Sequence, residues 1–404
     1  AARIFGQNAF TGAINIVTND NLENSIIAKI QGGSFGQFIA EVTGAVNLED
    51  SNHVIHFSKQ SSDGYRKNTD FDNTNYVLRS KFNKSKLPIN LISAFSERKF
   101  GAQNFYGVTS ALPYEVTQAS LIGLSTEIKS GNFTFKPRVY WRRNQDEYIF
   151  IRTNPSIYRN LHITNKIAGE FNGSYESKFG ITGFGLEFSK YMIQSNNLGD
   201  AEREIATLFL EHRFELFDKV VDITPGVAVS YFSDFDNRAF PGIDLGVKLS
   251  DRIRIYSNVG YTYRVPTYTD LNYSDPSTLG NPNLEAERAF AQELGFKYHA
   301  NKVDFNVAFF NRNTENFIDY RRATPADLWR PVNIDVETKG FESSLKYNFS
   351  LGKIKNQLNL GYTYIDDNIN TDLISKNGIN SMRHQVVFNY DIQLFKGFSQ
   401  NISY

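Results

Sequence analysis

The chain has 404 residues, with 43 basic and 43 acidic side chains, so it lacks the basic excess typical of nucleic-acid-binding proteins. It contains no cysteine, which excludes disulfides, thiolate metal sites and cysteine nucleophiles. No window approaches eighteen consecutive apolar residues, which excludes a transmembrane helix but not a β-barrel, whose apolar residues occupy only every second position.

Residues 1–22 differ from the rest of the chain. The stretch FGQNAFTGAINIVT (5–18) has two glycines around an Ala-Phe-Thr segment and then a compact strand. We interpret 1–22 as the end of a separate small domain and 23–404 as the main domain. The string GGSFG (32–36) resembles a nucleophile elbow, but a strand pattern follows it instead of a helix, so we place Ser34 in a turn and expect no enzyme.

From residue 23 onward the dominant pattern is period-two alternation, which predicts strands with one apolar and one polar face. In KVDFNVAFFNR (302–312), Val303, Phe305 and Val307 oppose Asp304 and Asn306. The apolar faces are long and often end in Tyr or Phe, as expected for strands that cross a lipid bilayer between two aromatic girdles.

The connections between the predicted strands alternate between short and long. Short turns are expected at 129–132, 250–252 and 299–302. Long polar loops are expected at 61–74, 101–113, 144–159, 193–203, 265–287, 320–332 and 366–379. This alternation is typical of outer-membrane barrels and gives about eighteen strands plus the start of another at the C-terminus. The fold class predicted is all-β, a transmembrane antiparallel barrel.

Three motifs stand out against this background. The first is FGQNAFTGAINIVT, with Gly6, Gly12 and Asn15. The second is YRVPTYTDLNYSDPSTLGNPNLEAER (263–288), and its informative residues are Arg264, Pro266, Thr267, Gly280, Asn281, Pro282, Asn283, Leu284 and Glu287. The third is NIDVETKGFESSLKY (333–347), with Gly340 and Glu342.

In this order and spacing the three motifs resemble those of TonB-dependent outer-membrane receptors; one departure is Ala286, where that family usually has proline before the glutamate. The resemblance implies a 22-stranded barrel filled by an N-terminal plug domain, of which residues 1–22 would be the end. It also implies import driven by TonB in the outer membrane of a Gram-negative bacterium. The expected neighbours are outer-membrane lipids and lipopolysaccharide, and the expected state is a monomer without a cofactor.

The Gly-Asn-Pro-Asn segment also has a structural explanation, which we favour over ligand contact. Gly and Asn tolerate turn geometry, and Pro282 cannot donate to a central strand ladder, so the segment suits the entry to a strand.

Aromatic and cationic loop residues are candidates for binding an anionic, aromatic-rich ferric siderophore or a cobalamin-like ligand by stacking and cation–π contact. These candidates are Tyr65, Arg66, Phe105, Tyr106, Arg321, Arg322, Trp329 and Arg330. Haem, a nickel chelate and an oligosaccharide stay open as ligands.

A resident metal or haem is not expected. The loop at 265–281, where some haem receptors of the family carry a ligating histidine, has none. His53 and His56 lie three apart on a predicted strand, which places them on opposite faces.

Two other readings remain open: a passive porin-like channel or structural surface barrel, and a soluble all-β surface protein. Because the chain starts at Ala1 and stops in mid-pattern at Tyr404, we expect a fragment whose segments near 24–33 and near 404 form open sheet edges.

Overall fold

The computed structural model describes residues 14, 23–82, 87–105, 111–376, 378 and 381–404. Within them the chain forms one 21-stranded antiparallel sheet. Its strands are β1 (Ser25–Gly32), β2 (Phe38–Leu48), β3 (Ser51–Ser62), β4 (Phe71–Phe82), β5 (Ile89–Gly101), β6 (Tyr114–Thr126), β7 (Ile128–Ser130), β8 (Phe133–Ile149), β9 (Arg159–Ser177), β10 (Gly180–Ser195), β11 (Ala201–Leu216), β12 (Val221–Phe232), β13 (Arg238–Lys248), β14 (Ile253–Arg264), β17 (Glu287–His299), β18 (Val303–Arg322), β19 (Arg330–Leu351), β20 (Ile354–Ile369), β21 (Ile374–Ser375), β22 (His384–Phe395) and β23 (Phe398–Ser403).

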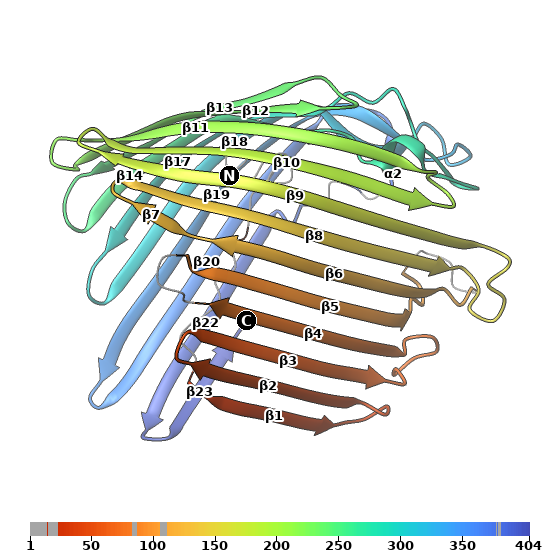
Figure 1. Cartoon of the computed structure of the whole chain (residues 1–404), viewed down its shortest axis with the longest axis horizontal. Helices are drawn as coiled ribbons and strands as arrows, with labels where there is room; N and C mark the ends of the chain where they lie inside the picture. Colours follow the sequence, from red (N-terminus) through yellow and green to blue (C-terminus); the bar gives the residue numbers. More distant parts are fainter. Residues whose placement is uncertain (1–13, 15–22, 83–86, 106–110, 377, 379–380) are drawn as a thin grey trace.

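The sheet is a meander that curls on itself, so that β17 to β23 lie behind β1 to β9 in Figure 1. Of its 21 strands, β7 prolongs β6 and β21 is a two-residue piece of a loop, which leaves nineteen strands in the wall of the described chain. The strand count and the fold class predicted from the alternation are therefore confirmed. No helix in the described part of the chain is long and apolar enough to cross a membrane.

The cross-strand register sorts side chains onto two faces. Ile255, Phe296 and Val307 stand in one row across β14, β17 and β18, while Arg254 and Lys297 pair in the next row. Since residues directly opposite each other share a face, the apolar row lies on the outer surface and the charged row lines the interior. The large exposed hydrophobic residues of these strands, such as Leu294, belong to the outer face.

The two ends of the barrel differ in their connections. Tight turns join the strands at one end, whereas the long loops and α2 (Tyr268–Asn272) gather at the other end, on the right in Figure 1. β1 pairs with β2 and β23 with β22, and no pairing in the described residues joins β1 to β23. This agrees with the expectation that both segments are sheet edges.

Several long loops are shorter than predicted. The expected loop at 144–159 is strand as far as Ile149 and again from Arg159, and the expected loop at 320–332 covers only 323–329. The outer ends of these strands carry polar residues on both faces, as in Asn144-Gln145-Asp146-Glu147. A strand that meets water on both sides shows no apolar alternation, so its sequence is mistaken for a loop. Ser34 does lie in the turn between β1 and β2, as predicted.

Candidate functional site: the outer loops

The loop at 265–286 lies at the mouth of the barrel, and an ion pair with a buried carboxylate holds its base. Arg264, the last residue of β14, lies opposite Glu287, the first residue of β17. Arg264 Nε donates to Glu287 Oε2 at 2.7 Å, and a second guanidinium nitrogen donates to the other carboxylate oxygen. Glu287 is fully buried and also accepts the backbone N–H of Ile318 at 2.8 Å. The two ends of the loop are therefore joined to each other and to β18.

The first turn of the loop is the short helix α2. The Thr267 hydroxyl accepts the backbone N–H of Asp270 at 3.1 Å, while the Asp270 carboxylate accepts the backbone N–H of Thr267 at 2.9 Å. This reciprocal capping box satisfies two helix donors that would otherwise lack partners. The same carboxylate lies 3.6 Å from Arg264, so the helix start is connected to the ion pair at the loop base.

The Gly-Asn-Pro-Asn segment closes the loop against α2. The Asn281 backbone donates to Asp270 O at 2.9 Å, its side-chain amide donates to Pro331 O at 3.1 Å, and its side-chain oxygen accepts the Asn283 N–H at 3.0 Å. A Cβ at Gly280 would lie 2.7 Å from the backbone oxygen of Leu271, so only glycine allows this approach. Leu284 is buried, whereas Pro282 and Asn283 are exposed.

A second set of contacts on this loop is centred on Arg203 of β11 and was not predicted from the sequence. Its guanidinium donates to Pro266 O at 3.1 and 3.2 Å and to the Asp234 carboxylate at 2.7 and 2.9 Å. The rings of Phe235 and Tyr268 lie 5.0 and 5.2 Å from it. Burial raises the pKa of Tyr268 to about 12, so the phenol stays neutral. No period or spacing connects Arg203 to these partners, because they come from different loops.

Two neighbouring loops are fastened to the far side of the same structure. β15 (Ser274–Asp275) and β16 (Thr278–Leu279) form a small hairpin. The Leu279 backbone N–H donates to Trp329 O at 2.9 Å, and the Trp329 N–H donates to Ser277 O at 2.9 Å. β21, from the loop after β20, pairs with the outer end of β18, and Lys376 Nζ donates to the Thr278 hydroxyl at 3.1 Å. We call the segments 265–286, 323–329 and 370–376 together the loop platform.

A second chain of contacts links the loops on the other side of the mouth. The ring of Phe35 packs edge-on against Tyr65 at 6.4 Å, and the Arg66 guanidinium lies 5.0 Å from the Tyr65 ring. Asn68 Nδ2 donates to Pro113 O at 2.7 Å, and Arg152 pairs with Asp70 at 2.7 Å.

Some of the candidate residues are exposed to solvent, whereas others are buried and bonded to groups within the protein. Tyr65 is 64% exposed and Phe105 77% exposed, and Arg66 and Arg330 are also exposed. Arg321 is only 5% exposed; it lies 2.8 Å from Asp319 and donates to Leu373 O, so it is removed from the candidates for ligand contact.

The remaining residues named from the sequence have mixed positions. The Arg322 guanidinium stacks on Trp329 at 4.0 Å, and Trp329 is half-buried. On the barrel wall, a Cβ at Gly340 would lie 2.2 Å from Tyr364 O, and Glu342 stands opposite Ala308. The residues that fall outside the described part of the chain are Tyr106, Gly6, Gly12 and Asn15.

The described residues contain no group of three or more His, Asp or Glu side chains that could hold a metal ion. His53 and His56 have separate partners, because His56 Nδ1 lies 2.8 Å from the Thr43 hydroxyl and His53 Nδ1 lies 2.9 Å from the Ser80 hydroxyl.

The structure is that of a membrane-barrel wall: antiparallel strands with an apolar outer face and a polar interior, and loops at one mouth that are hydrogen-bonded to one another. A family model described as "TonB dependent receptor-like, beta-barrel" matches residues 49–404, so the chain belongs to this family. This confirms the resemblance seen in the sequence motifs.

Among curated relatives, the vitamin B12 transporter BtuB of Vibrio vulnificus (strain CMCP6) is 20% identical over 377 residues, which cover 85% of this chain and 57% of that protein. BtuB of Photobacterium profundum is 20% identical over 385 residues, covering 90% of this chain and 61% of the relative. The chain thus spans about three fifths of these two relatives.

Among solved structures, the ferric yersiniabactin uptake receptor FyuA from Yersinia pestis has a TM-score of 0.73 at 15% identity, covering 97% of this chain and 69% of that one. The siderophore receptor PirA from Acinetobacter baumannii has a TM-score of 0.73 at 13% identity, covering 94% and 66%. At these identities the structures show a shared fold.

Proposed function

We propose that the protein containing this chain is an outer-membrane receptor of a Gram-negative bacterium that binds a scarce nutrient chelate and imports it actively with energy from TonB. A ferric siderophore or cobalamin is the proposed ligand, and residues 1–22 are proposed to be the end of the plug domain. The family membership of residues 49–404 is the observation that supports this proposal. The mechanism is binding and release, without bond chemistry, and the protein acts as a monomer.

The arrangement of the loops suggests where the ligand first binds. Phe35, Tyr65 and Arg66 present aromatic faces and a cation at the mouth, and Phe105 in the loop after β5 is also exposed. Aromatic rings attract cations and flat ligands, and a guanidinium binds carboxylate or catecholate oxygens. On the opposite side, Trp329 of the loop platform is flanked by the Arg322 guanidinium, from the end of β18, and by the exposed Arg330 at the start of β19.

Growth rescue tests the proposal. The full-length gene is placed in a strain that lacks its own receptors, and growth is measured on single ferric siderophores as the iron source and on cobalamin as the vitamin source. Rescue on one of these ligands that disappears when tonB is deleted is the expected result. Rescue that persists without TonB would identify a passive channel instead. Rescue on neither ligand class would refute the proposed cargo.

A further inference from the structure

The tight turns at one end of the barrel differ in charge, and those after β17, β19 and β22 carry lysines. Lys302, Lys353 and Lys396 stand at the tips of these three turns, and all three are exposed. Within the described part of the chain, no carboxylate forms an ion pair with any of them. We call these three side chains the lysine rim.

The three turns are neighbours in space. β18 pairs with β19 and β20 pairs with β22, so the three hairpins follow one another along the end of the barrel, at the lower left of Figure 1. Paired strands lie 4.7–4.9 Å apart, and successive turns are two strands apart, which places their tips about 10 Å from each other. The lysine rim is therefore one continuous surface.

The strand ends beside these turns add to the positive charge. Segments 297–304, 346–355 and 391–396 contain six lysines and two aspartates: Lys297, Lys302, Lys346, Lys353, Lys355 and Lys396 against Asp304 and Asp391. Asp304 is already occupied by an ion pair with His299. A surface on which one sign of charge dominates attracts counter-ions.

Other tight turns of the same barrel balance or reverse this charge. Lys219 Nζ lies 3.2 Å from Glu215, and Lys248 Nζ lies 2.7 Å from Asp251. The turn between β2 and β3 consists of two acidic residues, at 49–50. The concentration of positive charge between β17 and β23 is therefore not a general property of the turns.

Large apolar side chains stand next to the lysines. On the outer face of β19, the rings of Tyr347 and Phe349 stack at 5.0 Å, and Leu351 at the end of that strand is 61% exposed. The rings of Phe395 and Phe398 stack at 5.0 Å across the third turn. Aromatic rings favour the boundary between membrane and water, and a lysine stem extends along apolar surface while its amine reaches the polar headgroups.

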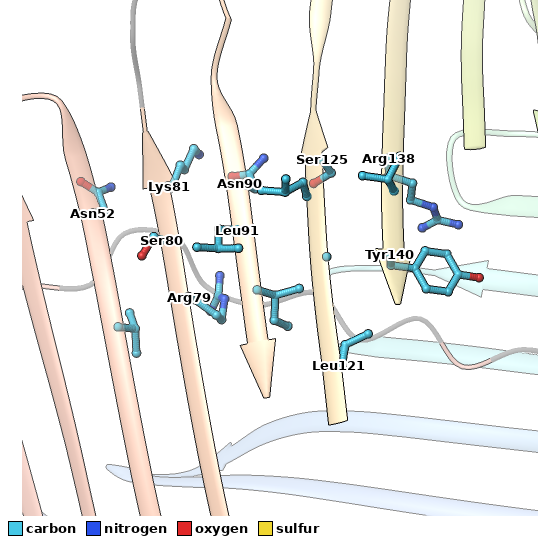
Figure 2. Close-up of a pocket in the computed structure, with 15 residues that line it drawn as sticks. Asn52, Arg79, Ser80, Lys81, Asn90, Leu91, Leu121, Ser125, Arg138 and Tyr140 are labelled. Carbon is cyan, nitrogen blue, oxygen red and sulfur yellow. The ribbon is translucent and has the colours of Figure 1, made fainter. Parts of the chain in front are cut away.

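Positive charge also lines the inner wall, as Figure 2 shows for Lys81 and Arg138. Those side chains stand inside the barrel, in the space that the proposed plug domain fills. The lysine rim lies beyond the end of the wall, where the outer face meets the surface of the lipid leaflet.

We propose that the lysine rim binds anionic phospholipids of the leaflet next to the tight turns. The three amines bind headgroup phosphates, while Leu351 and the aromatic rings of the outer face contact the acyl chains. Two observations favour this occupant: the charge of the rim is complementary to an anionic headgroup, and the rim continues the lipid-facing wall. The proposal depends on the barrel lying in a membrane, and not on the ligand that is imported.

Quenching of tryptophan fluorescence by brominated lipids tests this site in the full-length protein reconstituted into vesicles. The Leu351→Trp variant reports on lipid beside the rim, and the signal of the two native tryptophans is subtracted with the unaltered protein. Brominated phosphatidylglycerol and brominated phosphatidylcholine are compared at equal mole fraction. We expect the anionic lipid to associate about fivefold more strongly, the usual effect of one lysine at an anionic lipid surface.

Matched double variants in the Leu351→Trp background separate the rim from the rest of the barrel. Lys302→Gln with Lys353→Gln should remove most of the preference, whereas arginine at the same two positions should retain it, because the charge is kept. Lys219→Gln with Lys248→Gln, on turns elsewhere, should leave the preference unchanged. Raising the salt concentration from about 0.1 M to about 1 M should weaken it, since the Debye length falls from about 10 Å to about 3 Å.

Equal quenching of the Leu351→Trp variant by the two lipids, or equal loss of preference in both glutamine double variants, would overturn the inference. Loss of the preference on adding inorganic phosphate at constant ionic strength would also overturn it, because a soluble phosphate compound would then be the occupant. A failed growth rescue would leave the quenching result unaffected, since quenching requires neither a chelate nor TonB.

Discussion

Replacing Glu287 by alanine should release the base of the loop platform. The substitution removes both hydrogen bonds from Arg264 and leaves the buried backbone N–H of Ile318 without its acceptor. Breaking a buried ion pair costs about 3–5 kcal/mol, and orphaning a buried N–H costs about 1–3 kcal/mol. Arg264 is 31% exposed in its side chain and keeps Asp270 at 3.6 Å, so water and that carboxylate recover part of the loss.

We therefore expect a local destabilisation of about 2–3 kcal/mol, which corresponds to roughly 30- to 150-fold faster amide exchange of Ile318. Hydrogen exchange followed by mass spectrometry on the protein in detergent measures this, because local opening free energies appear directly as protection factors. Peptides from β9 and β10 serve as the internal reference and should not change.

Double substitution of Arg264 and Glu287 by apolar residues of similar size checks the electrostatic part of the reasoning. Such a replacement removes both charges and should recover much of the stability lost in Glu287→Ala, since a buried pair contributes little beyond a well-packed apolar contact. A change in Ile318 exchange of less than about twofold in Glu287→Ala would refute the view that this pair holds the loop base.

Three further perturbations test other parts of the mouth. Gly280→Ala should speed exchange of α2, because its Cβ would clash with backbone atoms of Leu271, whereas Gly361→Ala, whose Cβ finds only ordinary contacts, should be neutral; equal effects would contradict the close approach. Burial alone would raise the pKa of Asp275, but hydrogen bonds from Ser277 outweigh it and lower that pKa. The ionised carboxylate therefore stabilises the β15–β16 hairpin fully at pH values above the pKa of the unfolded chain. This stabilisation is lost as the pH falls through the lower pKa of the folded state. Proteolysis of the loop should therefore increase in acid below the ordinary pKa of 3.8 in the unaltered protein, and Asp275→Asn should flatten this pH dependence; an unchanged profile in the variant would contradict it. Tyr65→Ala should weaken binding of the cognate chelate by about 1–2 kcal/mol through loss of one aromatic contact, measured by equilibrium binding to cells, and an unaltered affinity would remove this loop from the ligand site.

Much of the barrel was readable from the sequence because lipid on one face and water on the other impose period two. The alternation in KVDFNVAFFNR predicts both the strand and its two faces, and β18 indeed places Val303, Phe305 and Val307 on one face. Where both faces meet water, as at the ends of β8 and β9, the same physics removes the signal, and the strands were predicted too short.

The contacts of the loop platform could not be predicted from the sequence, for a different reason. The partners of Arg203 are a backbone oxygen and a carboxylate 63 and 31 residues away. Nothing in the local sequence distinguishes this arginine from its neighbours, because a backbone acceptor has no residue type. Arg321 illustrates the converse: it lies beside other cationic and aromatic residues in sequence, yet folding turns its guanidinium toward Asp319 and Leu373 O.

The Gly-Asn-Pro-Asn segment is recognisable in the sequence, but its contacts are to groups far away in the chain. Its glycine is demanded by a backbone contact with Leu271, and the Asn281 side chain connects the next turn to the strand after β18. The arginine and glutamate that flank the loop bind each other, not an exposed group. A motif whose strongest donors and acceptors are used inside the protein is suited to fix the loop in place, which leaves ligand contact to the exposed side chains at loop tips. Substitutions in the motif should therefore affect the stability of the loop, whereas substitutions of Tyr65, Phe105 and their neighbours should affect which ligand binds.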